Sequence, residues 1–187
     1  IDRPLNDKGQ AQASKLAEAL ADLPLQLIAS SHLLRAKGTA QAIHEYHGSA
    51  QQTIVEDFGE LRFGAFEGRP WRGDHDYQTH KAARITDPTL KWPSSSEAIG
   101  ESVWDVAVRA QRGLDFVLGL NANQTDILIV AHTDLNRILM ALLLHGDPAC
   151  AHQILQGNTC VNVLDLDPIS CKWELRLMNF MEHAHET

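Results

Sequence analysis

The chain of 187 residues is long enough for one domain with a sizeable hydrophobic core. Its composition, 44% hydrophobic and 21% charged, is ordinary for a globular protein, and its formal net charge of -8 argues against a nucleic-acid partner, whose phosphates it would repel. A small phosphorylated ligand stays compatible with this charge, because a local arginine cluster can bind phosphate within an acidic protein. No apolar run approaches membrane-spanning length, so we expect no membrane partner.

The cysteines bear on the cellular compartment of the protein, and the first residue bears on whether the sequence includes its natural start. Three cysteines lack metal-ligand spacing, and their odd number leaves at least one unpaired, which fits a reducing compartment and predicts a cytoplasmic protein. The chain starts at Ile1, so we interpret it as missing its natural start, with a lost signal peptide left open. It shows no internal repeat or interdomain linker, and we predict a single domain over residues 1–187.

The N-terminal third predicts a helix, a strand and a second helix. Asn6 can cap a helix that Pro24 ends, and residues 25–29 form a short apolar strand. Two serines follow as helix-start residues, which places Arg35 near the beginning of the next helix. A solvated helix residue is the alternative interpretation of Arg35. The apolar side of the first helix is predicted to hold Ala13, Leu16, Leu20 and Leu23.

An acidic, glycine-interrupted loop follows at residues 54–66. His44 and His47, just before it, lie one helical turn apart, but no third metal ligand is suitably spaced, so we predict surface histidines. The loop can bring its backbone close to a ligand through its glycines, and a solvated acidic loop is the alternative. The glycines of this region are Gly59, Gly64 and Gly68.

Residues 69–99 are rich in Pro, Ser, His and Trp and have weak periodicity, which predicts an excursion acting as a lid or specificity segment. We expect Trp71 and Trp92 to anchor it, and the alternative is that they line a pocket. Ser102 and Asp105 then form a capping-box signal for a long helix. The apolar side of that helix is predicted to hold Val103, Val106, Ala107, Ala110, Leu114 and Val117.

Residues 126–144 form a second strand-to-helix unit. The run Ile127–Val130 predicts a strand buried on both faces, and Thr133 or Asp134 could cap the helix that follows. His132 lies at the junction between this strand and the helix, which is where ligands bind in parallel sheets. We therefore expect His132 and Arg35 at the same sheet edge. The alternative is a histidine that is hydrogen-bonded within the turn. The helix is predicted to bury Leu135, Ile138, Leu139 and Leu142.

The last part of the chain predicts an antiparallel hairpin that finishes the sheet. Residues 160–166 alternate between apolar and polar, residues 167–170 read as a turn, and residues 173–180 are again strand-like.

Four stretches, in order, resemble the histidine phosphatase superfamily, which contains the cofactor-dependent phosphoglycerate mutases. They are DRPLNDKGQAQASKLAEAL, IASSHLLRAKGTAQAI, GELRFGAFEG and IVAHTDLNRIL, and IGESVWDVAVRAQ is similar to the family's G-E-S helix start. Several motifs in register are far more specific than any one of them. The resemblance implies an α/β fold: a three-layer α/β/α sandwich with a mostly parallel sheet and an antiparallel C-terminal hairpin.

The resemblance also implies a phosphatase that transfers a phosphoryl group to histidine and then to water, acting on a small phosphorylated metabolite. Arg35 would hold phosphate oxygens, His132 would donate to the transferring group, and Glu60 would be the proton donor and later the base. Thr133 and Phe63 would contact substrate. Glu67 would brace the loop, and the acidic neighbours Glu56, Asp57 and Glu67 are candidates for raising the pKa of Glu60. No metal or other cofactor is implied.

Two positions depart from the family pattern. The R-H-G motif, which carries the histidine that becomes phosphorylated, is absent, so we predict that its strand lies upstream of Ile1 and that the chain as given is inactive. Thr133 stands where the family usually has Gly. Two alternatives remain open: a phosphoglycerate mutase, and an inactive homologue that only binds phosphate. The short excursion favours hydrolysis, and the oligomeric state is left open, a homodimer included.

Overall fold

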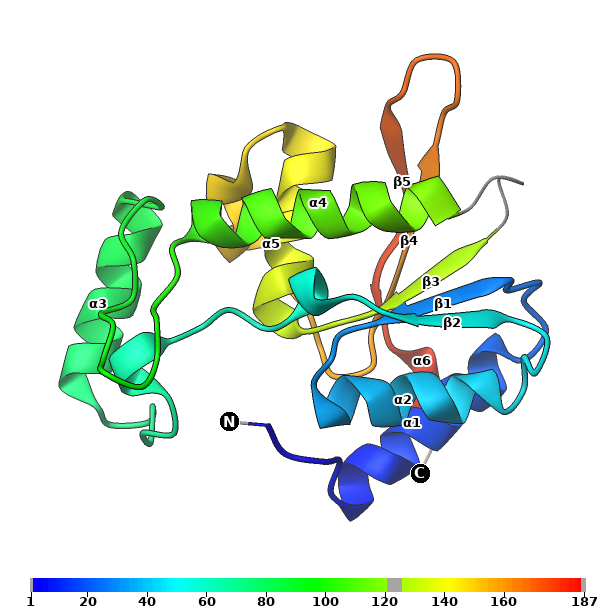
Figure 1. Cartoon of the computed structure of the whole chain (residues 1–187), viewed down its shortest axis with the longest axis horizontal. Coiled ribbons are helices and arrows are strands. Elements are labelled where there is room, and N and C mark those ends of the chain that lie inside the picture. Colours follow the sequence, from blue (N-terminus) through cyan, green and yellow to red (C-terminus); the bar gives the residue numbers. More distant parts are fainter. Residues whose placement is uncertain (1, 121–125, 186–187) are drawn as a thin grey trace.

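The computed structural model describes residues 2–120 and 126–185, and its centre is a small parallel sheet (Figure 1). Within these residues the sheet has three strands in the order β2-β1-β3: β2 is Gln51–Ile54, β1 is Leu27–Ser30 and β3 is Ile127–Val130. All three run parallel and in register, so that Ser30, at the carboxyl end of β1, pairs with the last residues of both neighbours. The three carboxyl ends therefore form one edge.

Helices cover both faces of this sheet, which confirms the predicted three-layer arrangement (Figure 1). On one face lie α1 (Asp7–Leu20) and α2 (Leu34–His44), and on the other lie α4 (Val103–Leu120) and α5 (Thr133–His145). Successive β1 residues point to opposite faces. Leu27 and Ala29 join the core under α4 and α5, whereas Ile28 joins the core under α1 and α2.

The starts of α1 and α4 follow the predicted local signals. The Asn6 side chain caps α1 by accepting the N–H of Gly9 at 2.9 Å. The capping box of α4 is also confirmed: Asp105 N–H donates to Ser102 Oγ at 3.0 Å, and Ser102 N–H donates to the Asp105 carboxylate at 2.9 Å. The apolar sides are buried largely as predicted, but Leu23 lies beyond the end of α1 and is exposed.

Two further burial predictions are wrong. The strand β3 is only half-buried along its length, because among the described strands it is an edge, and the fully buried position belongs to β1. His47 is buried, not on the surface, and its Nε2 atom contacts the backbone carbonyl of Leu20 at 3.1 Å. Leu20 is the last residue of α1, and its carbonyl has no partner within the helix, so the His47 imidazole has a structural role as a hydrogen-bond partner for it.

The hairpin is present but stands apart from the parallel sheet. Strands β4 (Val161–Leu166) and β5 (Trp173–Phe180) pair with each other, and in the described residues neither is hydrogen-bonded to β3, so the prediction that they finish the sheet is wrong. They attach through side chains instead: Leu164 and Trp173 pack on the α4–α5 core. The remaining short helices are η1 (Glu56–Phe58), η2 (Gly64–Phe66), η3 (Pro148–Gln153) and α6 (Glu182–His185).

The excursion contains helix α3 (His75–Thr86), which lies at one end of the molecule (Figure 1). Trp92 anchors it: this side chain is 1% exposed and stacks on Tyr77 with ring centroids 5.0 Å apart. Trp71 is 54% exposed, so the anchoring prediction is confirmed for Trp92 and wrong for Trp71. None of the helices in the described ranges combines the length and the apolar character needed to cross a bilayer.

Candidate active site

The carboxyl ends of β1 and β3 bring His132 to the side chain of Ser31. The Nε2 atom of His132 lies 2.8 Å from Ser31 Oγ, and both side chains are buried. Ser31 directly follows β1, and His132 follows β3 after one residue, so the pairing of the two strands fixes the contact. The same serine oxygen accepts the N–H of Leu33 at 3.2 Å, which holds it in place just before α2.

The surroundings of His132 are positively charged. The pKa of His132 is lowered to about 3, first by burial and then by the electrostatic effects of Arg35, His32 and Arg109, against a smaller opposing effect of Asp2. The imidazole is therefore neutral near pH 7. Arg35 is the second residue of α2 and is thus delivered to this edge, as the sequence predicted. A neutral imidazole surrounded by cations is a favourable place for an anion.

The start of α5 lies beside Glu60, which takes the role of its cap. His132 occupies the N-cap position without a side-chain cap bond, and the helix begins at Thr133. The prediction that Thr133 or Asp134 caps α5 is therefore wrong, because both already lie in its first turn. Instead the Glu60 carboxylate accepts the N–H of Leu135 at 3.3 Å, and it also accepts the N–H of Leu61 at 2.9 Å.

Glu60 keeps its proton to neutral pH. Its pKa is raised to about 7, first by burial and then by the charge of Asp134, against the opposing effect of hydrogen bonds from backbone N–H groups. The prediction that Glu56, Asp57 and Glu67 raise this pKa is wrong, because the acidic neighbour is Asp134. Glu56 is exposed, and the other two side chains bind elsewhere. Asp57 pairs with Arg112, with 2.7 Å from Nε to the carboxylate. Glu67 accepts the N–H of Phe63 at 2.9 Å, which confirms that it braces the loop.

Phe63 and Thr133, the two predicted substrate contacts, are half-buried. Phe63 packs against Trp92, with ring centroids 5.2 Å apart, and forms an isolated bridge with Gly100. Gly64, the next residue, has a φ of +56°, and a Cβ atom there would lie 2.1 Å from the carbonyl oxygen of Pro93. This glycine therefore serves a close approach to the excursion, whereas the sequence predicted a close approach to a ligand.

Four residues of this region were not among those predicted: Ser31, Asp134, Arg109 and Glu101. Ser31 and Asp134 were considered only as helix-start residues, and a local pattern gives no further signal for them. Glu101 lies within the G-E-S stretch, which pointed to a helix start but not to a side-chain role. In the residues that the structure describes, no three His, Cys, Asp or Glu side chains are grouped as a metal ion would require.

An α/β protein with a buried neutral histidine among cations, next to a protonated carboxyl group, has the parts of a phosphoryl-transfer enzyme. The chain belongs to the histidine phosphatase superfamily (branch 1), whose family model matches residues 1–180. The predicted family is thereby confirmed.

Three relatives agree with this assignment. The chain is 30% identical to an uncharacterized phosphatase, PhoE, of Bacillus subtilis, over 97% of this chain and 84% of that protein. It is 29% identical to an adenosylcobalamin/alpha-ribazole phosphatase of Salmonella typhimurium, over 87% of this chain and 78% of that protein. Among solved structures, a mycobacterial glucosyl-3-phosphoglycerate phosphatase superposes with a TM-score of 0.80 at 27% identity, covering 96% of this chain and 89% of that one.

Proposed function

We propose that this protein is a phosphatase that hydrolyses small-molecule phosphate monoesters through a phosphohistidine intermediate. Its homologues include phosphatases of the same superfamily. One observation carries the proposal: His132 is buried and neutral among positive charges, while Glu60 on the adjoining loop keeps its proton to about pH 7. This combination suits a site that binds an anion and protonates a leaving group.

The chemistry of the anion is assigned to three residues. Arg35 would hold phosphate oxygens through its planar fork of donors. His132 would donate an N–H to the phosphoryl group as charge spreads over its oxygens in the transition state, and Ser31 would orient the ring. Thr133, at the first position of α5, would present its backbone to the same oxygens.

Glu60 would act first as an acid and then as a base. Its protonated carboxyl group would donate to the departing alkoxide, and the resulting carboxylate would accept a proton from the water that attacks phosphohistidine. A pKa of about 7 serves both steps, because neither form is strongly disfavoured near neutrality.

The nucleophilic histidine is not assigned to any residue of this sequence. Residues 1–187 contain no R-H-G motif. The proposed cycle therefore requires that motif from the full-length protein, and we propose that residues 1–187 alone do not turn over. A full-length coding sequence without R-H-G would favour the alternative of a phosphate-binding homologue.

Substrate choice is assigned to the excursion at residues 69–99, together with Phe63. Tyr77 and Trp92 bring α3 against Phe63, so a change in the excursion would reach the wall of the site directly. We propose that this segment selects the alcohol part of the substrate as a lid or specificity element within a single domain.

A panel of phosphate monoesters assayed for phosphate release with the full-length protein tests the proposal. We expect hydrolysis of at least one ester, and its loss in His132→Ala. The mutase alternative is tested by incubation with 3-phosphoglycerate and a bisphosphate primer. Isomerisation faster than phosphate release would overturn the assignment as a phosphatase.

A further inference from the structure

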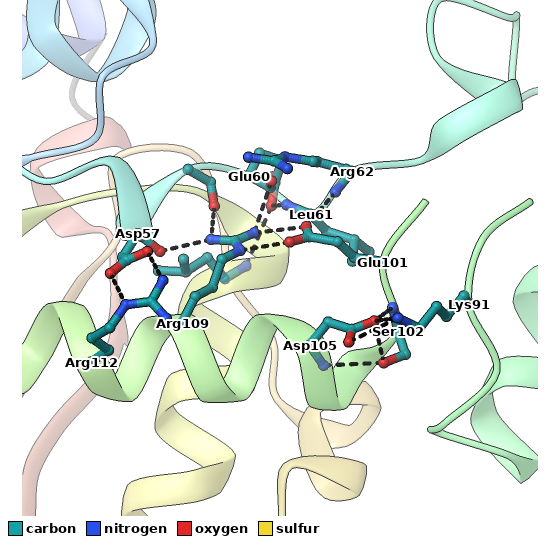
Figure 2. A network of polar contacts seen from close by, with 12 residues as sticks. Asp57, Glu60, Leu61, Arg62, Lys91, Glu101, Ser102, Asp105, Arg109 and Arg112 are labelled. Carbon is teal, nitrogen blue, oxygen red and sulfur yellow. Dashed lines mark hydrogen bonds and ion pairs between the residues drawn. The ribbon is translucent and has the colours of Figure 1, made fainter. Parts of the chain in front are cut away.

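Arg109, in the middle of α4, uses all of its guanidinium donors on the loop that carries Glu60 and on one carboxylate (Figure 2). Its NH1 atom donates to the carbonyl oxygens of Asp57 and Gly59, both at 2.7 Å. Its NH2 atom donates to the carbonyl oxygen of Glu60 at 3.0 Å. The Nε and NH2 atoms also bind the two oxygens of Glu101, at 2.8 and 3.0 Å. The loop backbone thus faces a planar group that fixes three of its carbonyls.

Glu101 holds the far end of the same loop. Its carboxylate accepts the N–H of Arg62 at 3.0 Å, and its own N–H donates to the Arg62 carbonyl at 3.0 Å. Its carbonyl accepts the N–H of Trp92, which connects the loop to the excursion. The Arg109–Glu101 pair therefore holds residues 57–62 from both sides, and both side chains are only 10% exposed.

We infer that Arg109 is a positioning residue for catalysis: it holds the backbone of Glu60 so that the carboxyl group lies at the start of α5. The inference rests on the proposed role of Glu60 as acid. While the Glu60 carbonyl is bound to α4, the Glu60 side chain accepts the N–H of Leu135 on α5. A lysine could not replace this fork, because one ammonium group cannot satisfy three carbonyls and both carboxylate oxygens in one plane.

Arg112 provides a matched control on the same helix. It lies three residues further along α4 and binds the same loop, but through the Asp57 side chain, and its own side chain is 66% exposed. Exposed ion pairs contribute little to stability. The same substitution at Arg109 and at Arg112 therefore compares a buried arginine that binds backbone carbonyls with a solvent-exposed arginine in an ion pair.

The first test compares Arg109→Lys with Arg112→Lys in the full-length protein, on two esters. One has an alkyl alcohol as leaving group, which needs a proton, and the other is p-nitrophenyl phosphate, which does not. In Arg109→Lys we expect kcat/KM to fall about 10²-fold for the alkyl ester, as for a misplacement of ~1 Å. For p-nitrophenyl phosphate we expect a loss below about threefold, and Arg112→Lys should stay within about twofold on both esters.

Equal losses on the two esters would show a merely structural role and would overturn the inference. Where Arg109→Lys does not fold, Glu101→Gln supplies the same comparison, because it removes the charge of the carboxylate that orients Arg109. Glu60→Gln calibrates the leaving-group effect, and we expect it to show the same preference for p-nitrophenyl phosphate.

A second measurement separates this inference from the proposed function. The Glu60 carboxyl group is titrated by carbon-13 NMR in the wild-type protein and in both lysine variants. Besides the Arg109 guanidinium at its backbone carbonyl, the charged and titratable groups that act on it are Asp134 on α5 and Tyr77 on α3, and neither of these is changed. A loosened loop exposes Glu60 to water, so we expect its pKa to fall by about one unit or more in Arg109→Lys only. An unchanged pKa with an active wild-type protein would overturn the inference and leave the proposed function standing. A wild-type protein inactive on all esters would overturn the proposed function and with it the catalytic part of the inference, and the pKa comparison would then test only whether Arg109 positions Glu60.

Discussion

The Nε2 atom of His132 lies 2.8 Å from the Oγ atom of Ser31, although 101 positions separate the two residues in the chain. Their strands are adjacent and parallel, so both residues emerge at one sheet edge. The serine hydroxyl fixes the rotation of the imidazole ring, and it is in turn fixed by the N–H of Leu33. This contact sets the direction in which the other ring nitrogen of His132 points.

Removal of the Ser31 hydroxyl should slow catalysis without removing it. A hydrogen bond of this kind contributes about 1 kcal/mol net, which corresponds to a rate loss of about fivefold. We expect Ser31→Ala in the full-length protein to lower kcat for phosphate release by that amount. Ser30→Ala changes a neighbouring buried serine and serves as control. Equal effects of the two substitutions would contradict an orienting role for Ser31.

The charge of Asp134 should set the alkaline limit of activity. Asp134 raises the pKa of Glu60, so Asp134→Asn should lower this pKa and move the alkaline fall of kcat/KM, expected near pH 7 in the wild-type protein, to lower pH. Asp115→Asn, on the exposed side of α4, makes the same charge change away from the site. A pH–rate profile of both variants measures this shift. An alkaline fall of kcat/KM at the wild-type pH in Asp134→Asn would refute the effect of Asp134 on the pKa of Glu60.

Glu60 should also make stability depend on pH. Its pKa rises from 4.5 to about 7 on folding, so the folded protein binds the extra proton, and this contribution is lost as pH increases through that interval. Glu60→Gln has no such loss. Relative to the wild-type protein it should therefore gain stability from about pH 5 to about pH 8, by up to ~3 kcal/mol at 1.36 kcal/mol per pKa unit.

Urea unfolding of both proteins at the two pH values measures this difference. His132 acts in the opposite direction, because its lowered pKa makes stability rise with pH from about 3 towards 6.5. This contribution is common to both proteins and cancels in the comparison. Glu97→Gln, at an exposed position, controls for the loss of a carboxylate. A constant difference between Glu60→Gln and the wild-type protein would exclude a raised pKa.

Phosphate binding should depend on Arg35 more than on its neighbours. A charge-assisted bidentate contact contributes about 1.5–3 kcal/mol, so Arg35→Gln should weaken binding of inorganic phosphate by about tenfold or more. Isothermal titration calorimetry on the full-length protein measures the affinity. Lys37→Gln removes a positive charge from the same helix two residues later, and we expect a change below about twofold. Similar losses in both variants would argue for a general charge effect.

Much of the architecture follows from local sequence patterns. The caps at Asn6 and Ser102, the strand at Ile127–Val130 and the turn of the hairpin lie where sequence neighbours predict them, because capping and side-chain periodicity involve residues only a few positions apart. The same reasoning placed Arg35 and His132 at one sheet edge, since parallel strands align their carboxyl ends. The family motifs added Glu60, which a glycine-rich acidic loop does not reveal by itself.

The sequence alone therefore determined the family, the α/β architecture and the residue types available for phosphate chemistry. Only the tertiary structure decided how these residues are protonated, oriented and buried. It showed which carboxylate faces Glu60, which hydroxyl orients His132 and that Arg109 binds the Glu60 loop, and it showed that β3 is half-buried and that the hairpin is not part of its sheet. The physical reason is that protonation and burial depend on the groups within a few ångströms in space. For Glu60 and His132 these groups come from positions about 50 to 100 residues away in the chain.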